Sequence, residues 1–402
     1  MSRQTAAPQL FYIAVFTFIL MGLPVSALNV AWLYIQDTFG LPLDALGVLL
    51  GVSTAGRLLM SLSAGPLTNR IGLGRFLLLG SLTLLLGLLG FALAPSWGLL
   101  VIFGMVHGVG FTMLNTGINT FAAAHYSPSR MNWLHAFFGV GTVIGPLLVT
   151  VAIFDLGLSW RWSYGFMIVL VLLLALIFLL TRSQWFIDQT DADAEGPRIS
   201  ARDTLRLPVV WLSLTLFFIH SGTQISSGQL ANSLFTEGRG LDPRLVGTWI
   251  SIFGASLTLG RVVTGLLVDR VGDVPFLRWN MLGTVIGAAL IWLQPSELLA
   301  FLGLALMGFT LGPGFPTLVS ATPRRVGLRH TANTIGFMIA GGGIGAALVP
   351  ALAGVLAERW GLETIGVVLV IASALTFIMH EILVANERRH LAPLQVEPVV
   401  KT

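Results

Sequence analysis

Long apolar runs, separated by short polar stretches, dominate the pattern of this chain from residue 10 to residue 385. About 20 consecutive apolar residues cross the ~30 Å hydrocarbon core of a bilayer as a helix. Twelve such spans with short loops account for nearly all 402 residues. The pattern therefore predicts an all-α membrane protein with twelve transmembrane helices, at residues 10–36, 44–68, 75–94, 97–124, 131–155, 161–182, 208–236, 244–268, 274–294, 297–322, 329–357 and 361–385.

One stretch is too polar to be membrane-embedded, and it lies between the sixth and seventh spans. Residues 183–207 hold five of the acidic residues among several arginines. Such a charged segment is typical of a solvated linker. The chain is thus expected to divide into an N-terminal six-helix bundle (1–182), a cytoplasmic linker (183–207) and a C-terminal six-helix bundle (208–402).

The two predicted bundles resemble each other when the chain is shifted by 200 residues. Nine glycines then coincide with glycines, and rarer residues agree as well, such as Arg70 with Arg270 and Trp160 with Trp360. Internal repetition of this length indicates a duplicated structural unit. We expect two pseudo-symmetric bundles whose glycines mark places where helices pack closely.

Some spans carry residues that bend or break a helix. Pro24 lies in the first span, and Gly312–Pro316 reads GPGFP in the tenth. Proline removes a backbone hydrogen bond and kinks a helix. A carrier that alternates between two openings needs such bends.

Composition excludes a soluble enzyme. Hydrophobic residues make up 55% and charged residues 10% of the chain, against roughly 45–50% and about 25% in soluble domains. The chain has no cysteine, so disulfides, thiolate nucleophiles and iron–sulfur clusters are excluded. We expect no cofactor and no metal site, and we find no paired acids or His–Glu cluster within the spans for an intramembrane enzyme.

The positive charges indicate topology. The net charge of +4 comes from scattered residues, 21 Arg and one Lys, which does not indicate nucleic-acid binding. With the N-terminus inside, sixteen basic residues fall on inner segments and four on outer loops. Basic residues favour the cytoplasmic side. We expect a monomer in the inner (plasma) membrane, surrounded by lipid, with both termini cytoplasmic and an uncleaved first helix.

A paired loop motif carries a family resemblance. GPLTNRIGLGR (65–75) follows the second span, and GLLVDRVGD (265–273) follows the eighth. This pattern on a 6+6 frame resembles the major facilitator superfamily, which implies its fold of two six-helix bundles. The resemblance implies that residues of the two loops latch the cytoplasmic helix ends; the gating candidates are Gly65, Arg70, Gly72, Asp269 and Arg270. The alternative is that these arginines only mark inside loops, and Asn69 departs from the usual Asp.

A second resemblance covers spans four and five, residues 114–148. Asn119, Arg130, Asn132 and His135 match the pattern of the fucose:proton symporter branch. Asn115 stands where that branch has its acidic residue. Because that acid is the expected proton carrier, the departure puts proton coupling in question.

None of the 18 carboxylates falls near a predicted bilayer centre. Proton-driven carriers use an intramembrane group whose charge switches. A coupling proton would therefore depend on His107, His135 or His220, although a buried histidine is often only a hydrogen-bonded structural residue. Facilitated diffusion stays open, and a carboxylate-based sodium site is disfavoured.

Polar residues inside the spans predict the binding site, because they are costly unless they face a cavity or a partner. Helical spacing groups them by face. The candidate residues for substrate binding are Asn29, Trp32, Arg57, His107, Asn115, Asn119, Asn132, His135, His220 and Gln224. Amides with an aromatic surface suit a neutral polyhydroxylated ligand such as a sugar. The alternative is that they bond helix to helix.

Two arginines fall inside spans. Arg261 lies about one turn before the second loop motif, where its side chain can reach the inner interface, so we interpret it as structural. Arg57 lies near mid-membrane with no carboxylate close in sequence. An unpaired arginine there is expensive. Arg57 therefore also allows an anionic substrate, a sugar acid or another organic anion.

The leading interpretation is a secondary active or facilitative transporter of a small polar solute, sugar-like, working by alternating access. The alternative is a multidrug or metabolite exporter, because Gly141–Pro146 has the G-x-x-x-G-P pattern of drug:proton antiporters. Gly104 stands where that group has an arginine, which counts against it. A non-transporting membrane receptor on the same fold is the third interpretation.

Overall fold

The structure is a computed structural model that describes residues 8–42, 45–187 and 199–391. Within these residues, twelve helices are long and apolar enough to cross a membrane, and no strand is present. The predicted all-α membrane fold with twelve spans is therefore confirmed. The acidic residues Asp188, Asp191, Asp193 and Glu195 of the predicted linker lie outside the described residues.

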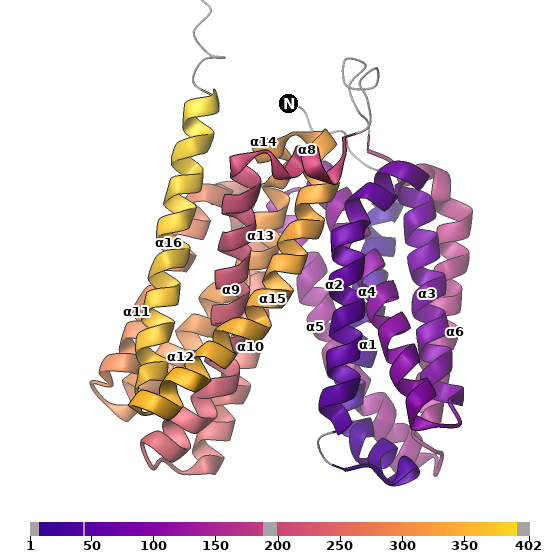
Figure 1. The fold of residues 1–402 in the computed structure, drawn as a ribbon, viewed down its shortest axis with the longest axis horizontal. Helices are drawn as coiled ribbons and strands as arrows, with labels where there is room; N and C mark the ends of the chain where they lie inside the picture. Colours follow the sequence, from indigo (N-terminus) through magenta and orange to yellow (C-terminus); the bar gives the residue numbers. More distant parts are fainter. Residues whose placement is uncertain (1–7, 43–44, 188–198, 392–402) are drawn as a thin grey trace, which may run out of the picture. The chain divides into compact units, whose positions relative to one another are not determined.

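The chain divides into two compact units, one of Met1–Ala201 with Leu328–Ala340 and one of Arg202–Gly327 with Gly341–Thr402. In the first unit, α1 packs on α5, α4 packs on α2 and α3, and α3 packs on α6 (Figure 1). Its helices are α1 (Pro8–Phe39), α2 (Ala45–Ile71), α3 (Leu73–Leu93), α4 (Trp97–His125), α5 (Pro128–Thr150) and α6 (Arg161–Thr181).

The second unit repeats this packing. There α12 packs on α10 and α11, and α16 packs on α9 and α11. Its helices are α9 (Pro208–Asn232), α10 (Pro243–Val271), α11 (Asp273–Leu293), α12 (Glu297–Leu311), α13 (Gly314–Ser320), α14 (Thr322–Val326) and α16 (Thr364–Leu391), preceded by the short α8 (Ala201–Leu205). Helix α15 (Leu328–Trp360) contributes its first thirteen residues, Leu328–Ala340, to the first unit and the rest to the second.

Local geometry repeats at the same 200-residue offset as the sequence. Helix α3 spans Leu73–Leu93, and helix α11 spans Asp273–Leu293. The glycine just before each helix is left-handed, with φ 84° and ψ 151° at Gly72 and φ 92° and ψ 148° at Gly272. Only glycine adopts this backbone region readily. The conformation explains why both copies of the loop motif keep glycine at this place.

Arginines cap the ends of these two helices. The guanidinium of Arg161 donates to the carbonyls of Ala92 (3.1 Å) and Ala94 (2.8 Å) at the end of α3. Arg239 donates to the carbonyl of Ile291 (2.7 Å) near the end of α11. The last carbonyls of a helix lack helical donors. Arg161 and Arg239, two of the four basic residues on predicted outer loops, therefore bond carbonyls at helix ends, one in each unit.

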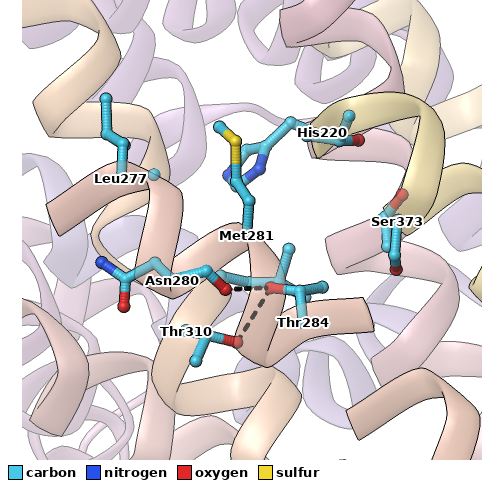
Figure 2. Close-up of a pocket in the computed structure, with 11 residues that line it drawn as sticks. His220, Leu277, Asn280, Met281, Thr284, Thr310 and Ser373 are labelled. Atoms are coloured by element: carbon cyan, nitrogen blue, oxygen red, sulfur yellow. Dashed lines mark hydrogen bonds between the residues drawn. The ribbon is translucent and has the colours of Figure 1, made fainter. Parts of the chain in front are cut away.

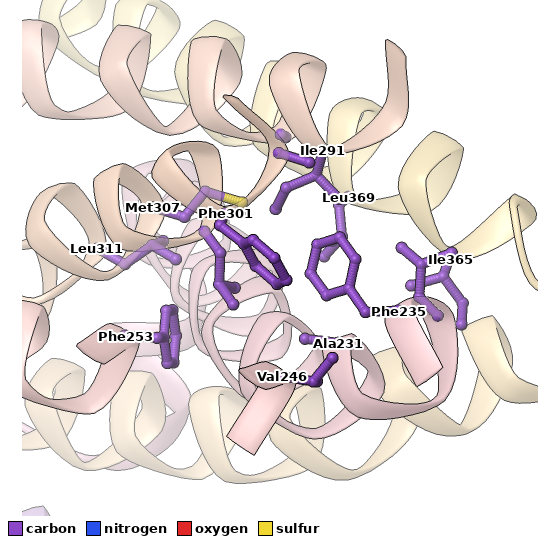
Figure 3. Packing of buried hydrophobic residues seen from close by; sticks show 14 of the residues in the cluster. Ala231, Phe235, Val246, Phe253, Ile291, Phe301, Met307, Leu311, Ile365 and Leu369 are labelled. Atoms are coloured by element: carbon purple, nitrogen blue, oxygen red, sulfur yellow. The ribbon is translucent and has the colours of Figure 1, made fainter. Parts of the chain in front are cut away.

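The second unit has an aromatic and aliphatic core (Figure 3). The rings of Trp249 and Phe301 stack with centroids 5.2 Å apart and planes 3° apart. Phe235 packs on Phe301 at 5.0 Å. The cluster joins α9, α10, α11, α12 and α16, with Leu234, Val246, Phe253, Ile291, Leu304, Met307, Ile365 and Leu369 among its buried residues. This packing holds the helices that surround the polar cavity described below.

Close packing of α1 on α5 depends on glycine. A Cβ atom at Gly141 would overlap the carbonyl oxygen of Ile19, and one at Gly145 would overlap that of Leu23. Backbone atoms cannot move aside as a flexible side chain can. The two glycines of the G-x-x-x-G-P pattern in the fifth span therefore mark a helix crossing in which the backbones touch.

We expect Gly141→Ala to lower the free energy of unfolding by about 1–3 kcal/mol, the usual cost of overpacking a tight contact. Gly47→Ala is the matched control, because Gly47 is an exposed α2 residue and a Cβ there meets nothing within 4 Å. Alanine should stabilise that helix by up to about 1 kcal/mol. Thermal unfolding of both variants in one detergent checks the pair, and equal midpoints would contradict the close-packing account.

Candidate functional site

Arg57 lies on α2 in the first unit and is half-buried. Its guanidinium sits over the ring of Phe111 on α4, 4.2 Å from the ring centroid. Arg57 makes no hydrogen bond or ion pair with any described residue. A cation–π contact offsets part of the cost of a buried cation but supplies no hydrogen-bond acceptor. Its five N–H donors stay available to a ligand.

Arg57 lines a cavity of about 70 Å³ between α1, α2, α3, α4 and α6. Pro24, Leu49 and Phe91 are among its apolar lining residues, with His107 and Tyr164 beside them. Both polar residues are buried, at 7% and 1% exposure. Among the described residues, the Nε2 atom of His107 and the hydroxyl of Tyr164 have no hydrogen-bond partner.

The arrangement of these three side chains is chemically specific. The ring of Phe91 stacks on Tyr164 at 5.0 Å and meets the edge of His107 at 6.0 Å, so the aromatic packing orients both polar residues. A guanidinium and a phenol hydroxyl are donors, and the Nε2 atom of a neutral imidazole donates in one of its two tautomers. Unpaired buried polar groups are rare in proteins. Donors that line one mainly apolar cavity favour an acceptor as its ligand, and a charged acceptor gives the strongest bonds.

A second polar group joins α4 and α5. Asn119, which is fully buried, donates through Nδ2 to the Asn115 backbone carbonyl (2.8 Å) and to its side-chain oxygen (2.7 Å). His135 Nε2 lies 3.2 Å from Asn119 Oδ1. The i, i+4 spacing and the resemblance to the symporter branch thus identified residues that do contact one another. Their bonds are made largely within the group.

The remaining candidates of the first unit have different surroundings. Asn29 is exposed on α1. Trp32 is buried and meets the ring of Trp97 edge-on at 5.9 Å, and its indole N–H has no hydrogen-bond partner in the part of the chain that the structure describes. Asn132 donates through Nδ2 to the Pro128 carbonyl at 2.9 Å, within the first turns of α5. Their roles in substrate binding stay predictions.

In the second unit His220 lies in a different cavity, of about 10 Å³ (Figure 2). The cavity is enclosed by α9, α11, α12, α13 and α16. The candidate Gln224 is not among the residues that line it. The lining includes Asn280, Thr284, Thr310 and Ser373, which sequence analysis did not identify. Asn280 and Thr284 share one face of the ninth span at i, i+4 spacing, a signal that could have found them.

Arg261 has a structural contact in the same unit. Its Nε donates to the carbonyl of Gly312 at 3.0 Å. Gly312 and Pro313 separate α12 from α13, so the predicted break in the tenth span is present. A broken membrane helix frees backbone carbonyls that need donors. The contact agrees with the structural role inferred for Arg261, although the partner is a helix break and not the membrane surface.

The gating candidates lie at helix ends. Arg70 is exposed at the end of α2, and Asp269 and Arg270 are exposed at the end of α10. A Cβ atom at Gly65 would overlap Asn333 of α15, so glycine allows a close approach there. A latch between the two halves stays a prediction.

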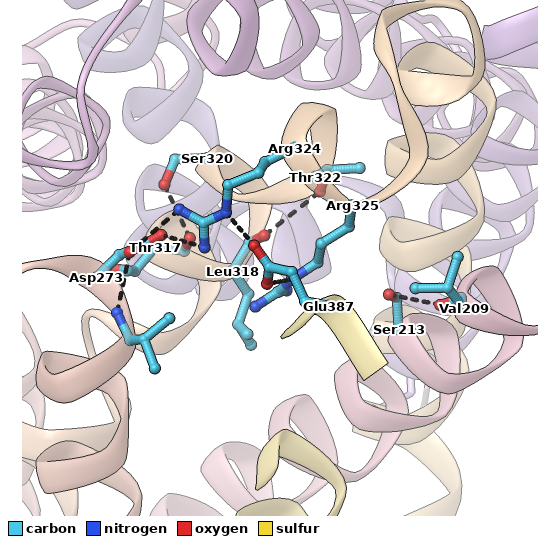
Figure 4. Close-up of polar contacts among 11 residues, drawn as sticks. Val209, Ser213, Asp273, Thr317, Leu318, Ser320, Thr322, Arg324, Arg325 and Glu387 are labelled. Atoms are coloured by element: carbon cyan, nitrogen blue, oxygen red, sulfur yellow. Dashed lines mark hydrogen bonds and ion pairs between the residues drawn. The ribbon is translucent and has the colours of Figure 1, made fainter. Parts of the chain in front are cut away.

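Charged residues form a cluster near the end of α16 (Figure 4). Arg324 pairs with Asp273 at 3.0 Å and with Glu387, and Arg325 pairs with Glu387 at 3.6 Å. The side chain of Arg325 is only 2% exposed. Burial lowers the pKa of Arg325 to about 10, with the Glu387 carboxylate opposing the shift. The cluster ties the segment after α13 to α11 and α16.

Comparisons with known proteins place the chain in a family. The family model described as Major Facilitator Superfamily matches residues 14–235 and 212–398. A protein of Mycobacterium tuberculosis named "Probable nitrate/nitrite transporter NarK2" is 27% identical over 331 residues, covering 80% of this chain and 82% of the relative.

Solved structures share the fold at low sequence identity. The E. coli fucose:proton symporter FucP has a TM-score of 0.78 at 17% identity, covering 94% of this chain and 98% of that one. The human organic anion transporter MFSD10 has a TM-score of 0.69 at 15% identity, covering 93% of this chain and 100% of that one. The resemblance inferred from the paired loop motif is confirmed: this chain belongs to the major facilitator superfamily of membrane transporters.

Proposed function

We propose that this protein transports a small anion across the membrane by alternating access of its two helical halves, with Arg57 as the anion-binding residue. Arg57 carries the proposal, because it is a cation within a membrane span that has no acidic partner among the described residues. An intramembrane charge needs a counter-charge, a carbonyl cluster or a water-filled path. An anionic substrate supplies the counter-charge.

The surroundings of Arg57 support a small anion. The cavity of about 70 Å³ has mainly apolar walls, and the donors of His107 and Tyr164 line it with Arg57. In such surroundings charge-assisted hydrogen bonds are strong because water does not compete for them. A planar anion of the size of nitrate or a small carboxylate can accept from all three groups. The nitrate/nitrite relative supports the same ligand class.

The ligand class can be tested by thermal unfolding of the purified protein against nitrate, nitrite, small carboxylates, sugar acids, neutral sugars and lipophilic cations. A ligand at about 100 times its dissociation constant stabilises a protein by about 2.7 kcal/mol. We expect stabilisation by small anions at constant ionic strength, with chloride as the salt control. Stabilisation by neutral sugars alone would overturn the proposal, and a response to lipophilic cations alone would favour the exporter.

A neutral sugar is the second candidate, and the group of Asn115, Asn119 and His135 favours it. Amide groups are donors and acceptors at once, as sugar hydroxyls are, and the fold is shared with a fucose:proton symporter. The mutual hydrogen bonds of the group would have to open for a sugar. Asn119→Ala separates the candidates, because it should remove stabilisation by a sugar and leave stabilisation by an anion.

A further inference from the structure

The cavity beside Arg57 occupies a place that is filled with apolar side chains in the second unit. Three of its lining residues have bulkier or less polar counterparts at the 200-residue offset: Leu49 matches Trp249, Ser53 matches Phe253 and His107 matches Met307. Phe253 and Met307 are buried in the apolar core of the second unit, and Trp249 packs against it (Figure 3). The fold therefore does not require a cavity at this place.

The helix crossings at the two places have the same backbone contact. A Cβ atom at Gly108 of α4 would overlap the carbonyl oxygen of Ser53, and one at Gly308 of α12 would overlap that of Phe253. Protein interiors are close-packed, and backbones in contact leave no slack between helices. The side chains, and not a wider helix spacing, therefore decide that the first unit has a cavity here.

Three of the lining residues form a row on α2. Leu49, Ser53 and Arg57 follow one another at intervals of four residues, so they lie on one face of the helix, and all three line the cavity. At a rise of about 1.5 Å per residue, Leu49 lies about 12 Å from Arg57 along the helix axis. The row thus has a cationic end at Arg57 and an apolar end at Leu49.

Leu49 is a fixed wall at the apolar end. Its side chain is 1% exposed. It packs on Gly104 of α4, where a Cβ atom would lie only 2.6 Å from Cδ1 of Leu49. A leucine held this closely against a neighbouring helix cannot turn aside for a ligand without displacing its neighbours.

We infer that Leu49 sets the length of the anion that the Arg57 site accepts, an inference that rests on the proposed anion transport. The cavity of about 70 Å³ has the space of roughly two water molecules at ~30 Å³ each. Compact oxyanions such as nitrate, nitrite, formate and acetate fit this space with their charge at Arg57. The alkyl tail of a longer carboxylate meets Leu49, so the site rejects it although its charge is the same.

Binding constants for an unbranched series of carboxylates test the limit, because only length changes along the series. Thermal unfolding of the purified protein is titrated with nitrate, formate, acetate, propionate and butyrate at neutral pH and constant ionic strength. We expect wild type to bind butyrate at least about 10-fold more weakly than acetate, since one surplus methylene in an apolar pocket discriminates by about 10–200-fold. Butyrate that binds wild type as tightly as acetate would overturn the length limit.

Variants of Leu49 make the test specific. Leu49→Ala removes three carbon atoms from the wall and should reduce the preference for acetate over butyrate at least about 5-fold while nitrate still binds. Leu49→Val removes one carbon atom and should reduce the preference by a smaller factor; it serves if the alanine variant does not fold. An unchanged preference in the folded variant would overturn the inference.

Leu77→Ala is the matched control. Leu77 of α3 is also a buried leucine packed on a glycine of α4, Gly117, and it is not among the residues that line the Arg57 cavity. Its preference should equal that of wild type, and a change as large as in Leu49→Ala would contradict the role of Leu49. Nitrate binding without a length limit would overturn this inference alone, whereas a wild-type protein that binds none of these anions would overturn the proposed function and the length limit with it.

Discussion

Replacement of Arg57 by glutamine is expected to abolish anion binding while the ligand-free protein remains at least as stable as wild type. Truncation of a charged partner in a buried, hydrogen-bonded pair costs about 2–5 kcal/mol of binding, a loss of roughly 30- to 5000-fold. Arg57 has no hydrogen-bond or ion-pair partner of its own among the described residues. Removal of its charge therefore eliminates a desolvation cost and strands no acid. Thermal unfolding with and without nitrate measures both effects.

Two controls distinguish a binding role from a structural one. Arg57→Lys keeps the charge but loses the planar fork of donors, so we expect weakened binding in place of none. Arg75→Gln removes an exposed arginine without an ion pair among the described residues and should keep the full nitrate response. A clearly lowered unfolding temperature of ligand-free Arg57→Gln would contradict the account, because it would identify Arg57 as a structural residue.

Glu387→Gln is expected to destabilise the second unit by about 3–5 kcal/mol, the cost of breaking a buried ion pair by removing one partner. The side chain of Glu387 is 11% exposed and that of Arg325 is 2% exposed. The amide leaves the buried Arg325 guanidinium without its carboxylate, whereas Arg324 keeps its ion pair with Asp273. Equilibrium unfolding of the detergent-solubilised protein gives the difference in free energy.

The exposed pair of Arg206 and Asp203 is the matched control. Their side chains are 67% and 48% exposed and lie 3.4 Å apart. Exposed ion pairs contribute about 0–1 kcal/mol, so Arg206→Gln should change stability by no more than that. Similar losses in Glu387→Gln and Arg206→Gln would show that burial of the cluster has no energetic consequence.

The fold was predictable because its main determinants are local. Long apolar runs give the spans, and the predicted 75–94 and 274–294 fall close to α3 (Leu73–Leu93) and α11 (Asp273–Leu293). The paired glycine loops indicated the family. Some local details depend on tertiary contacts and were not predicted. Val151–Asp155 and Ser233–Gly238 form π-helical turns at span ends, and Arg161 and Arg239 cap other helices.

The candidate site was only partly predictable, because a cavity collects residues from helices far apart in sequence. Helical spacing found Asn115 with Asn119, which contact each other. Arg57 was identified as an unpaired cation, yet its neighbour Tyr164 comes from α6, more than 100 residues away. The cavity of His220 is lined by residues from other helices, such as Asn280 of α11 and Ser373 of α16. The spacing of Asn29 and Trp32 predicts that they lie on one face of the first helix, but Asn29 is exposed and Trp32 is buried.

Counterflow of a labelled anion in proteoliposomes tests the central claim most directly. Vesicles preloaded with unlabelled nitrate exchange it for labelled nitrate only if the protein moves the anion, whatever ion is coupled to net transport. We predict saturable exchange in wild type, none above empty vesicles in Arg57→Gln, and full exchange in Arg75→Gln. Counterflow of a neutral sugar, without exchange of nitrate, nitrite, a small carboxylate or a sugar acid, would contradict the account.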